Sequence, residues 1–565
     1  MEINSSAKAA KKPNKDRTIS RLWSVLPPAV RWPLLLSGSG DAWLLPLVNA
    51  LAEAMGKESG AAQLLRPVLY DLALHAWELN PLSAQAASIV FMLQEQQPFL
   101  SKGALTLCKI AKFLKPGNPP LAKRIQNCFL EGDNDAVKPL LNKALSGEPA
   151  NPFWFYFASY LGLRLGEQDW YEARLQKAPL PRDLHQMLLA DLLFARESFA
   201  EAAALYAEVY SRTALPELLV RQGECEKRLG GREAAAICWQ KALAQRPWQV
   251  NLILRLSDLL AGRDLPRAQP PGRGQILLYS WNHGQDLNLT LQELYASDLG
   301  DAGLTLLDNG STDNTAEVAC AWQERFGSRM RRITLPVNVG APAARNWLLR
   351  TEEALAASWV VFLDDDALVP CNWLGLLGSA AHTLPEASII GCRIVDQAAP
   401  MAMQSVDLHL EPEFDPDGAP LGELPFSLVE SHQMCLDYGQ FNYLRPTLSV
   451  TGCCHLLTRK GIDSTGPFDL RFSPSQFDDL ERDLRAATGG AYCVYQGHLA
   501  VRHLKRSGKA ANLSAWQLAN VTGNIKKLML SYPPEQLGRL CRDDLDRQHG
   551  FLLQRLEEIA QHKPA

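Results

Sequence analysis

The amino-acid sequence changes character at a cluster of prolines and glycines. Pro266, Pro270, Pro271, Gly272 and Gly274 lie close together, and such residues interrupt both helices and strands. Before the cluster, apolar residues recur at spacings of three and four, which is typical of helices packed along one face. After it, short apolar runs alternate with helical stretches, as the βαβ units of a parallel sheet require. The chain therefore divides into a helical half and an α/β half.

A chain of 565 residues is too long for one hydrophobic core, so we expect several domains. The sequence predicts a disordered basic tail over residues 1–20 and a helical domain over 21–180. Helical repeats over 181–265, an α/β domain over 266–507 and a helical extension over 508–565 follow. The predicted fold class is multidomain, all-α and then α/β.

A repeated pattern lies late in the helical half. It places small residues where two antiparallel helices touch, an aromatic residue in the groove and a proline after the second helix. The pattern consists of Gly223, Ala235, Trp239, Ala242 and Pro247, and Ala190, Ala202 and Tyr206 occur 33 positions before its first three apolar positions. This spacing resembles the tetratricopeptide repeat, and the alternative is an ordinary helical bundle.

Composition excludes some classes of partner. The net charge is −4, so no basic field is available to hold nucleic acid. The apolar stretch from Leu22 is interrupted by Pro27, Pro28 and Arg31, which is unlike a secretory signal, and no run of about eighteen apolar residues predicts a transmembrane helix. The twelve cysteines form no C-x-x-C pair, which is typical of reduced thiols. We therefore expect a cytoplasmic protein without a nucleic-acid partner or a transmembrane segment.

The α/β half shows an ordered series of strands and helices. Predicted strands are 276–279, 304–307, 333–335 and 359–363, with later candidates at 388–390 and 492–495. Predicted helices are 287–296, 315–326 and 342–356. Ligands of an open α/β sheet bind beyond the carboxyl ends of its strands, so the residues that follow each strand are the candidates for a site.

Polar residues follow each of the first four predicted strands. They are Ser280, Trp281, Asn282 and His283 after the first; Asp308, Asn309, Gly310, Ser311, Thr312 and Asp313 after the second; Asn338, Gly340, Arg345 and Asn346 after the third; and Asp364, Asp365 and Asp366 after the fourth. Asp313 is also placed to cap the helix that follows it. This clustering is the layout expected of a substrate cleft.

The three consecutive aspartates are the most informative of these residues. An apolar strand, VVFL, leads directly into them, and the two-residue period of a strand sends Asp364 and Asp366 to one side and Asp365 to the other. Two carboxylates on one side repel each other unless a cation lies between them. Mg²⁺ and Mn²⁺ take oxygen ligands and complete their shells with substrate phosphates. The pattern predicts a metal–diphosphate site, and the alternative is a solvated acidic turn.

Several segments, in order, resemble the inverting GT-A glycosyltransferase family that includes chitin and hyaluronan synthases. The resemblance runs from about Gly272 to Ser507, and its segments are LLYSWNHGQDLNLTLQEL, LLDNGSTDNT, NVGAPAARN, FLDDDALVPCNWL, TGCCHLLTRKGIDSTGPFDLRF, FDDLERDLRAATGGAYCVY and LAVRH. It implies a nucleotide-sugar donor, UDP-linked by default, a divalent metal (Mn²⁺ or Mg²⁺) and inversion at the anomeric carbon. Agreement of this many segments in order is more specific than any one motif.

The resemblance also implies roles for individual residues. Asp308 contacts the nucleotide base, Arg345 is a diphosphate partner, and Asp366 binds the metal with support from Asp364. His503 is a further metal or diphosphate ligand, and the alternative is a structural histidine. Asp479, with Asp478 next, is the general base that accepts the proton of the attacking hydroxyl. Both acids also suit the start of a helix, which is the bland alternative.

The sequence departs from the family pattern in places. The family's Glu-Asp pair is Asp478-Asp479 here. The segment 397–443 matches no part of the family pattern and suggests an acceptor-binding insertion or lid. Trp281 stands where a tyrosine is common in the family. Trp373 is expected either in the acceptor groove or, preferably, in the core. The acceptor is predicted to be a protein or a surface polysaccharide that the helical repeats dock. The alternative function is a non-catalytic scaffold that retains the fold.

Overall fold

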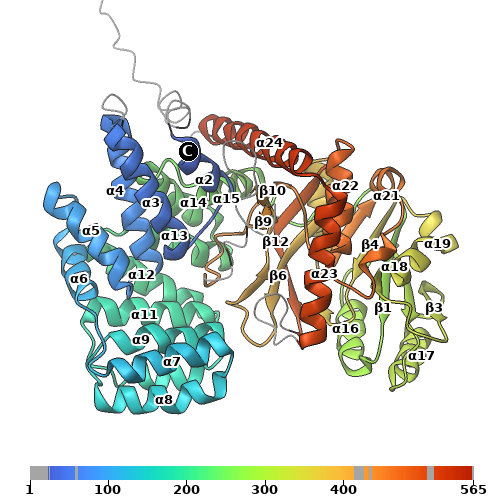
Figure 1. The fold of residues 1–565 in the computed structure, drawn as a ribbon, viewed down its shortest axis with the longest axis horizontal. Coiled ribbons are helices and arrows are strands. Elements are labelled where there is room, and N and C mark those ends of the chain that lie inside the picture. The colour runs from blue at the N-terminus through green and yellow to red at the C-terminus, as the bar shows by residue number, and fades with distance from the viewer. Residues whose placement is uncertain are drawn as a thin grey trace, which may run out of the picture.

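The computed structural model describes Trp23, residues 26–57, 62–412, 426–429, His432, 435–505 and 514–562. Within these ranges an all-helical half precedes a half built on a large β-sheet (Figure 1). The predicted basic tail over 1–20 lies outside the described residues. No helix of the described part is both long enough and apolar enough to cross a membrane.

Successive helices stack against their neighbours to form the first half, as the spacing of apolar residues predicts. They are α2 Pro28–Leu35, α3 Asp41–Lys57, α4 Ala62–Leu79, α5 Ala84–Gln96, α6 Lys102–Lys112, α7 Pro119–Glu131, α8 Asn134–Gly147, α9 Phe153–Ser159, the π-helix η1 Tyr160–Arg164, α10 Gln168–Leu175, α11 Arg182–Ala195, α12 Phe199–Thr213, α13 Pro216–Arg228, α14 Arg232–Gln245 and α15 Val250–Ala261.

Helices α11 to α14 pack in sequence, each on the next, where the repeat was predicted. A Cβ atom at Gly223 would lie 2.4 Å from the Nε1 atom of Trp239, so α13 and α14 can approach only because residue 223 is a glycine. Ala202, Tyr206 and Trp239 are fully buried. The helical pairs are therefore present, and their assignment as tetratricopeptide repeats stays a prediction.

The second half is a ten-stranded sheet whose main strand order is β10-β12-β6-β11-β4-β1-β2-β3, with β5 paired to β12 and β7 to β6. Its strands are β1 Gly274–Ser280, β2 Gly303–Asp308, β3 Met330–Thr334, β4 Trp359–Leu363, β5 Ala367–Leu368, β6 Ile389–Asp396, β7 Met403–Ser405, β10 Leu444–Thr447, β11 Cys454–Thr458 and β12 Cys493–His503. A small separate hairpin pairs β8 Leu410–Pro412 with β9 Phe426–Leu428.

The prediction of a parallel sheet holds only for part of it. Strands β1 to β4 pair in parallel, as do β6 and β12. Strand β11 lies antiparallel between β4 and β6, and β10 lies antiparallel to β12, so the sheet is mixed. Neither antiparallel strand was predicted, because both are short and follow segments without a clear helical pattern.

Helices cover both faces of this sheet. They are α16 Gly284–Ala296, α17 Thr315–Phe326, the 3-10 turn η2 Gly327–Arg329, α18 Ala341–Leu349, α19 Glu352–Leu355, α20 Trp373–Thr383, α21 Arg459–Thr465, the 3-10 turn η3 Leu470–Phe472, α22 Asp478–Thr488, α23 Ala515–Ser531 and α24 Pro534–Gln561. The single helix predicted over 342–356 is two helices, since the Thr351 hydroxyl accepts a hydrogen bond from the backbone N–H of Ala354 and starts a new one.

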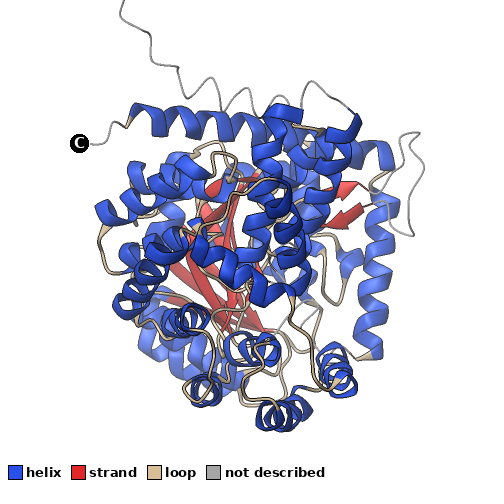
Figure 2. Cartoon of the chain, turned by 90° about the vertical axis from the view of Figure 1, so that its left-hand side faces the viewer, coloured by secondary structure: helices blue, strands red, loops and turns tan. Residues whose placement is uncertain are grey.

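The two halves share one hydrophobic core. Part of the unmatched segment 397–443 packs against the repeats. The guanidinium carbon of Arg221 lies 3.9 Å from the ring centroid of Tyr438, and the side chain of Asn442 donates a hydrogen bond to Glu224. Helix α24 runs back over α15, β10 and α2 and so ties the C-terminal end to the first half (Figure 1). Seen from the side of the helical half, the strands lie behind a layer of helices (Figure 2).

Candidate active site

The backbone of the three aspartates after β4 is held at both ends. The N–H of Asp364 donates to the carbonyl of Cys453 just before β11, and the carbonyl of Asp366 accepts from the N–H of Leu504 just after β12. The aspartates are thus tied to the start of β11 and the end of β12. Asp365 and Asp366 are buried, and Asp364 is partly exposed.

The two buried carboxylates have different partners. Asp365 accepts a hydrogen bond from the Ser280 hydroxyl at 2.5 Å and lies 3.4 Å from His283. The Oδ1 atom of Asp366 lies 2.9 Å from Nε2 of His503. Of the residues predicted as metal ligands, the structure therefore brings Asp366 and His503 into direct contact.

The pKa values of Asp364 and Asp366 are shifted in opposite directions. Burial, together with the neighbouring Asp366 carboxylate, raises the pKa of Asp364 to about 7 although Arg345 opposes this. Burial would also raise the pKa of Asp366, but the hydrogen bond and charge of His503 hold it below the usual value. The ligand atoms of Asp364, Cys453 and His503 all lie within 4.8 Å of one another. Carboxylate, imidazole and thiol groups at this spacing fit a divalent cation.

A second group of predicted residues holds the loops after β1, β2 and β3 together. Ser311 is fixed by two bonds: its backbone N–H donates to Asp308, and its hydroxyl accepts from the N–H of Asn282 at 3.0 Å. The Asn309 side chain donates to Asn338 at 2.9 Å and accepts from the N–H of Val339. These bonds give the loops one fixed shape at the carboxyl edge of the sheet.

Three further residues of these loops have structural partners. The N–H of Gly340, at the start of α18, donates to the side chain of Asn338. Asp313 accepts from the N–H groups of Thr315 and Gly284, so it supports the starts of α17 and α16. Asn346 exchanges two hydrogen bonds with the backbone of Phe468. Asn346 therefore holds the acceptor-side segment in place, and a direct contact of its side chain with the donor stays a prediction.

The start of α22 brings the two candidate bases close to Arg345. Asp478 is buried and accepts from Arg345 at 2.6 Å, and the same guanidinium lies 3.8 Å from Asp364. Asp479 is only partly buried, and it accepts from the N–H of Gly452 at 2.6 Å. Arg345 thus links the two acidic groups, although Asp478 lies 133 positions after it.

The remaining acids of α22 have structural partners. Asp483 is fully buried and accepts from Ser449 and from the N–H of Val450. Glu481 pairs with Arg485 and accepts from the hydroxyl of Tyr532. These acids hold the segment before β11 and the C-terminal helices, whereas Asp479 is partly exposed. Trp373, the alternative groove residue, is fully buried in the core.

The structure adds residues that sequence reasoning missed. Cys453 joins Asp364 and His503, Lys505 lies 3.7 Å from Asp366, and Gln404 contacts Nδ1 of His503. The position of Cys453 inside a matched segment was a usable signal, but cysteines were interpreted only as reduced thiols. Gln404 comes from the unmatched segment 397–443, so nothing in its surroundings pointed to the site.

Comparison with known proteins agrees with this arrangement. Residues 276–464 match the model of glycosyl transferase family 2. The chain carries a family 2 glycosyltransferase domain. The matched range begins in β1, contains Asp364 to Asp366 and Cys453, and ends before α22. The acids of α22 and His503 are therefore placed at the site by the structure alone.

One curated relative matches more than a third of the chain. The O-antigen biosynthesis protein RfbC of Myxococcus xanthus is 25% identical over 208 residues, which is 37% of this chain and 15% of that protein. The chain thus matches only a small part of the length of this relative, and nothing about the whole relative transfers to it directly.

Three solved structures show low overall similarity to this chain. GalNAc-T7 with UDP, GalNAc and Mn²⁺ has a TM-score of 0.33 and 12% identity, covering 46% of this chain and 48% of that one. The mannosyltransferase PcManGT of Pyrobaculum calidifontis with GDP-Man and Mn²⁺ has a TM-score of 0.32 and 18% identity, and the match covers 58% of this chain and 86% of that one. Residues 1–349 of S. aureus TarS have a TM-score of 0.33 and 15% identity, and the match covers 49% of this chain and 72% of that one. At these scores the site rests on its own geometry.

Proposed function

We propose that the chain transfers a sugar from a nucleoside-diphosphate donor to an acceptor hydroxyl with inversion at the anomeric carbon. One observation supports this above the others: Arg345 contacts both Asp478, which precedes the partly exposed candidate base Asp479, and Asp364. The name cation-binding group is used for Asp364, Asp366, Cys453 and His503. A base for the acceptor and a site for the leaving diphosphate are therefore held side by side, as a single displacement requires.

Each group has a separate task in this reaction. Asp479 is placed to accept the proton of the attacking hydroxyl, because it is partly exposed and its hydrogen bonds within the described part come from backbone N–H groups. Asp478 and Arg345 neutralise each other and fix the start of α22. Asp364, Asp366 and His503 would hold a divalent cation, Mn²⁺ or Mg²⁺, which supplies positive charge to the leaving diphosphate. The loop of Asp308 to Ser311 would bind the nucleotide.

Product analysis tests this proposal. The chain is supplied with a UDP-sugar, with GDP- and dTDP-sugars in parallel, and the anomeric configuration of the product is read by NMR. A product of opposite configuration to the donor is expected. Retention of configuration would contradict the role of Asp479, and failure to bind any nucleotide would favour the alternative of a non-catalytic scaffold.

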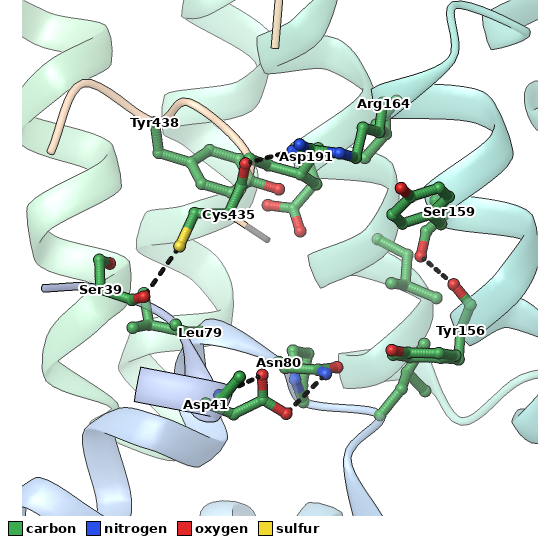
Figure 3. Close-up of a pocket in the computed structure, with 18 of the residues that line it drawn as sticks. Ser39, Asp41, Leu79, Asn80, Tyr156, Ser159, Arg164, Asp191, Cys435 and Tyr438 are labelled. Carbon is green, nitrogen blue, oxygen red and sulfur yellow. Dashed lines mark hydrogen bonds between the residues drawn. The ribbon is translucent and has the colours of Figure 1, made fainter. Parts of the chain in front are cut away.

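We also propose where the acceptor docks. A cavity with a volume of about 260 Å³ lies in the helical half. It is closed on one side by Cys435 to Gln440 of the unmatched segment, where the Arg164 guanidinium donates to the Cys435 carbonyl (Figure 3). Both halves of the chain therefore form it.

The lining of this cavity suits a neutral, hydroxyl-rich ligand. Asp41 lies on one side with Asn80 bonded to it, Asp191 lies on the other, and the ring of Tyr156 faces the space between them (Figure 3). Asp191 is paired with the Arg221 guanidinium, and the guanidinium of Arg164 also lines the cavity, so polar groups of both signs are available to sugar hydroxyls. The volume is just below the roughly 300 Å³ at which ligand pockets begin, which suits one sugar ring of a glycan acceptor.

Binding of free oligosaccharides to the full chain tests the docking site. The double variant Asp41→Asn with Tyr156→Ala should weaken glycan binding about tenfold or more, since a lost pocket contact is worth at least 1.4 kcal/mol. Hydrolysis of the donor should be unchanged. The matched control is Tyr295→Ala, another exposed tyrosine outside the cavity. Equal glycan binding by wild type and double variant would disprove the docking site without affecting the transfer proposal.

A further inference from the structure

The cation-binding group contains an unexpected thiol. Cys453 precedes β11, is 5% exposed, and places its sulfur within 4.8 Å of ligand atoms of Asp364 and His503. The backbone bond from Asp364 to the Cys453 carbonyl fixes these two residues beside each other. Among the described residues, this is the single group of three or more such side chains close enough to share a metal ion.

The orientation of His503 is set by Gln404 on β7. The side-chain Nε2 of Gln404 donates to the carbonyl of Lys505 at 2.9 Å, so its Oε1 atom must face Nδ1 of His503, also at 2.9 Å. An amide oxygen can only accept, so Nδ1 carries the proton in the neutral ring. Nε2 is then left with a lone pair, and it points at the Asp366 carboxylate.

A lone pair facing a carboxylate at 2.9 Å requires a cation or a proton between or beside the two atoms. The arrangement is thus the usual one for a metal-bound histidine, whose other ring nitrogen donates to a fixed oxygen.

We propose that Cys453 is a direct ligand of the cation held by Asp364, Asp366 and His503, and that its sulfur makes the site prefer Mn²⁺, Co²⁺ or Zn²⁺ over Mg²⁺. Thiolates favour the softer divalent ions, and oxygen ligands alone favour Mg²⁺. Binding breaks the S–H bond, forms a metal–sulfur bond and releases the proton to solvent. Gln404 is a positioning residue for His503. The inference rests on the proposed function for the presence of the cation.

Cobalt spectroscopy tests the ligand without any donor or turnover. The full chain is titrated with Co²⁺ under reducing conditions, and the near-ultraviolet thiolate-to-cobalt charge-transfer band is recorded. Wild type should show the band with one equivalent of Co²⁺, and Cys453→Ser should lose it. The matched control is Cys454→Ser, which removes the adjacent buried thiol on β11 and should keep the band. Absence of the band in wild type, or its persistence in Cys453→Ser, would overturn the proposal.

Metal competition tests the preference and the role of Gln404. Loss of an outer-shell partner costs about 10- to 100-fold in metal affinity, so Gln404→Leu should weaken Co²⁺ binding by this factor and keep the band at saturation. Cys453→Ser should lower the ratio of Mn²⁺ to Mg²⁺ affinity at least about tenfold. An unchanged ratio would contradict the sulfur ligand. Donor turnover without a cobalt band would reject only this inference, and a band without turnover would reject only the proposed function.

Discussion

Two neighbouring aspartates show how much one position in a helix can matter. Asp478 is 3% exposed and accepts from Arg345, while Asp479 is partly exposed and accepts only backbone N–H groups among its described contacts. Burial raises the pKa of Asp478 although Arg345 opposes this. The sequence pattern makes both aspartates candidates for the base. Their surroundings show that Asp478 belongs to a buried ion pair and that Asp479 is partly exposed.

Replacing Asp479 by asparagine should therefore lower activity, and replacing Asp478 by asparagine should lower stability. Asp479→Asn should lower kcat by about 10²- to 10⁴-fold and leave the urea midpoint unchanged. Asp478→Asn leaves the buried Arg345 without its partner and should cost about 3–5 kcal/mol of stability. Sugar transfer and urea unfolding of both variants check this. A stable, inactive Asp478→Asn together with an active Asp479→Asn would reverse the assignment.

At the scale of loops and strands, the site depends on a close approach between the loops after β2 and β3. Gly310 has a φ of 74°, and a Cβ atom there would lie 2.4 Å from the backbone carbon of Val337. No side-chain adjustment relieves a contact with backbone, so the glycine is needed both for its conformation and for its small size.

Gly310→Ala should therefore abolish nucleotide binding and lower the melting temperature, since strain of this kind costs roughly 1–3 kcal/mol before the clash is counted. Gly490→Ala is the matched control, because Gly490 has a φ of 82° and no atom within 4 Å of an added Cβ. It should lose stability by strain alone and still bind nucleotide. Calorimetry of both variants with UDP measures the difference, and full nucleotide binding by Gly310→Ala would argue against these loops.

Sequence patterns predicted the elements that local rules determine. Strands β1, β2 and β4 and helix α17 lie where the apolar runs place them. The antiparallel strand β11 was not predicted, because its place between β4 and β6 depends on residues far away in the chain. Gln404 and Cys453 reach the site through the same long-range pairing, which no local pattern reports.

At the scale of the whole molecule, the helical half and the sheet behave as one body because they share a core. Tyr438 from the second half is buried against Arg221 and Phe194 of the first, with its ring centroid 5.4 Å from that of Phe194. Tyr438→Ala should destabilise the chain by about 3–5 kcal/mol and still leave a single calorimetric transition. Trp516→Ala, which removes an aromatic side chain that is 65% exposed, is the control. Two separate transitions in wild type would contradict the shared core.

A buried ion cluster at the same junction predicts a pH dependence. His409 lies 2.6 Å from Asp544 and 3.1 Å from Asp407, which also binds Arg445. Burial alone would lower the pKa of His409, but the two carboxylates raise it. Burial alone would raise the pKa of Asp407, but Arg445 and His409 lower it to about 2.

The signs follow from these two shifts. The raised pKa of His409 adds stability that is complete below about pH 6.5 and is lost as the pH rises through the folded value. The lowered pKa of Asp407 adds stability above about pH 4 that is lost as the pH falls toward 2. The urea midpoint should therefore fall at both ends, and His409→Gln should remove the His409 contribution to the alkaline decrease. Parallel profiles for wild type and variant above pH 6.5 would refute this.

The most direct test of the account is donor turnover by the full chain with Mn²⁺ or Mg²⁺, comparing wild type with Asp366→Ala across a panel of nucleotide sugars. The account predicts metal-dependent hydrolysis of one donor by wild type and loss of this activity by at least about 10²-fold in the variant, with both chains equally folded by circular dichroism. Equal turnover by the two chains, or turnover unaffected by a chelator, would contradict a sugar transfer that depends on the carboxylates after β4.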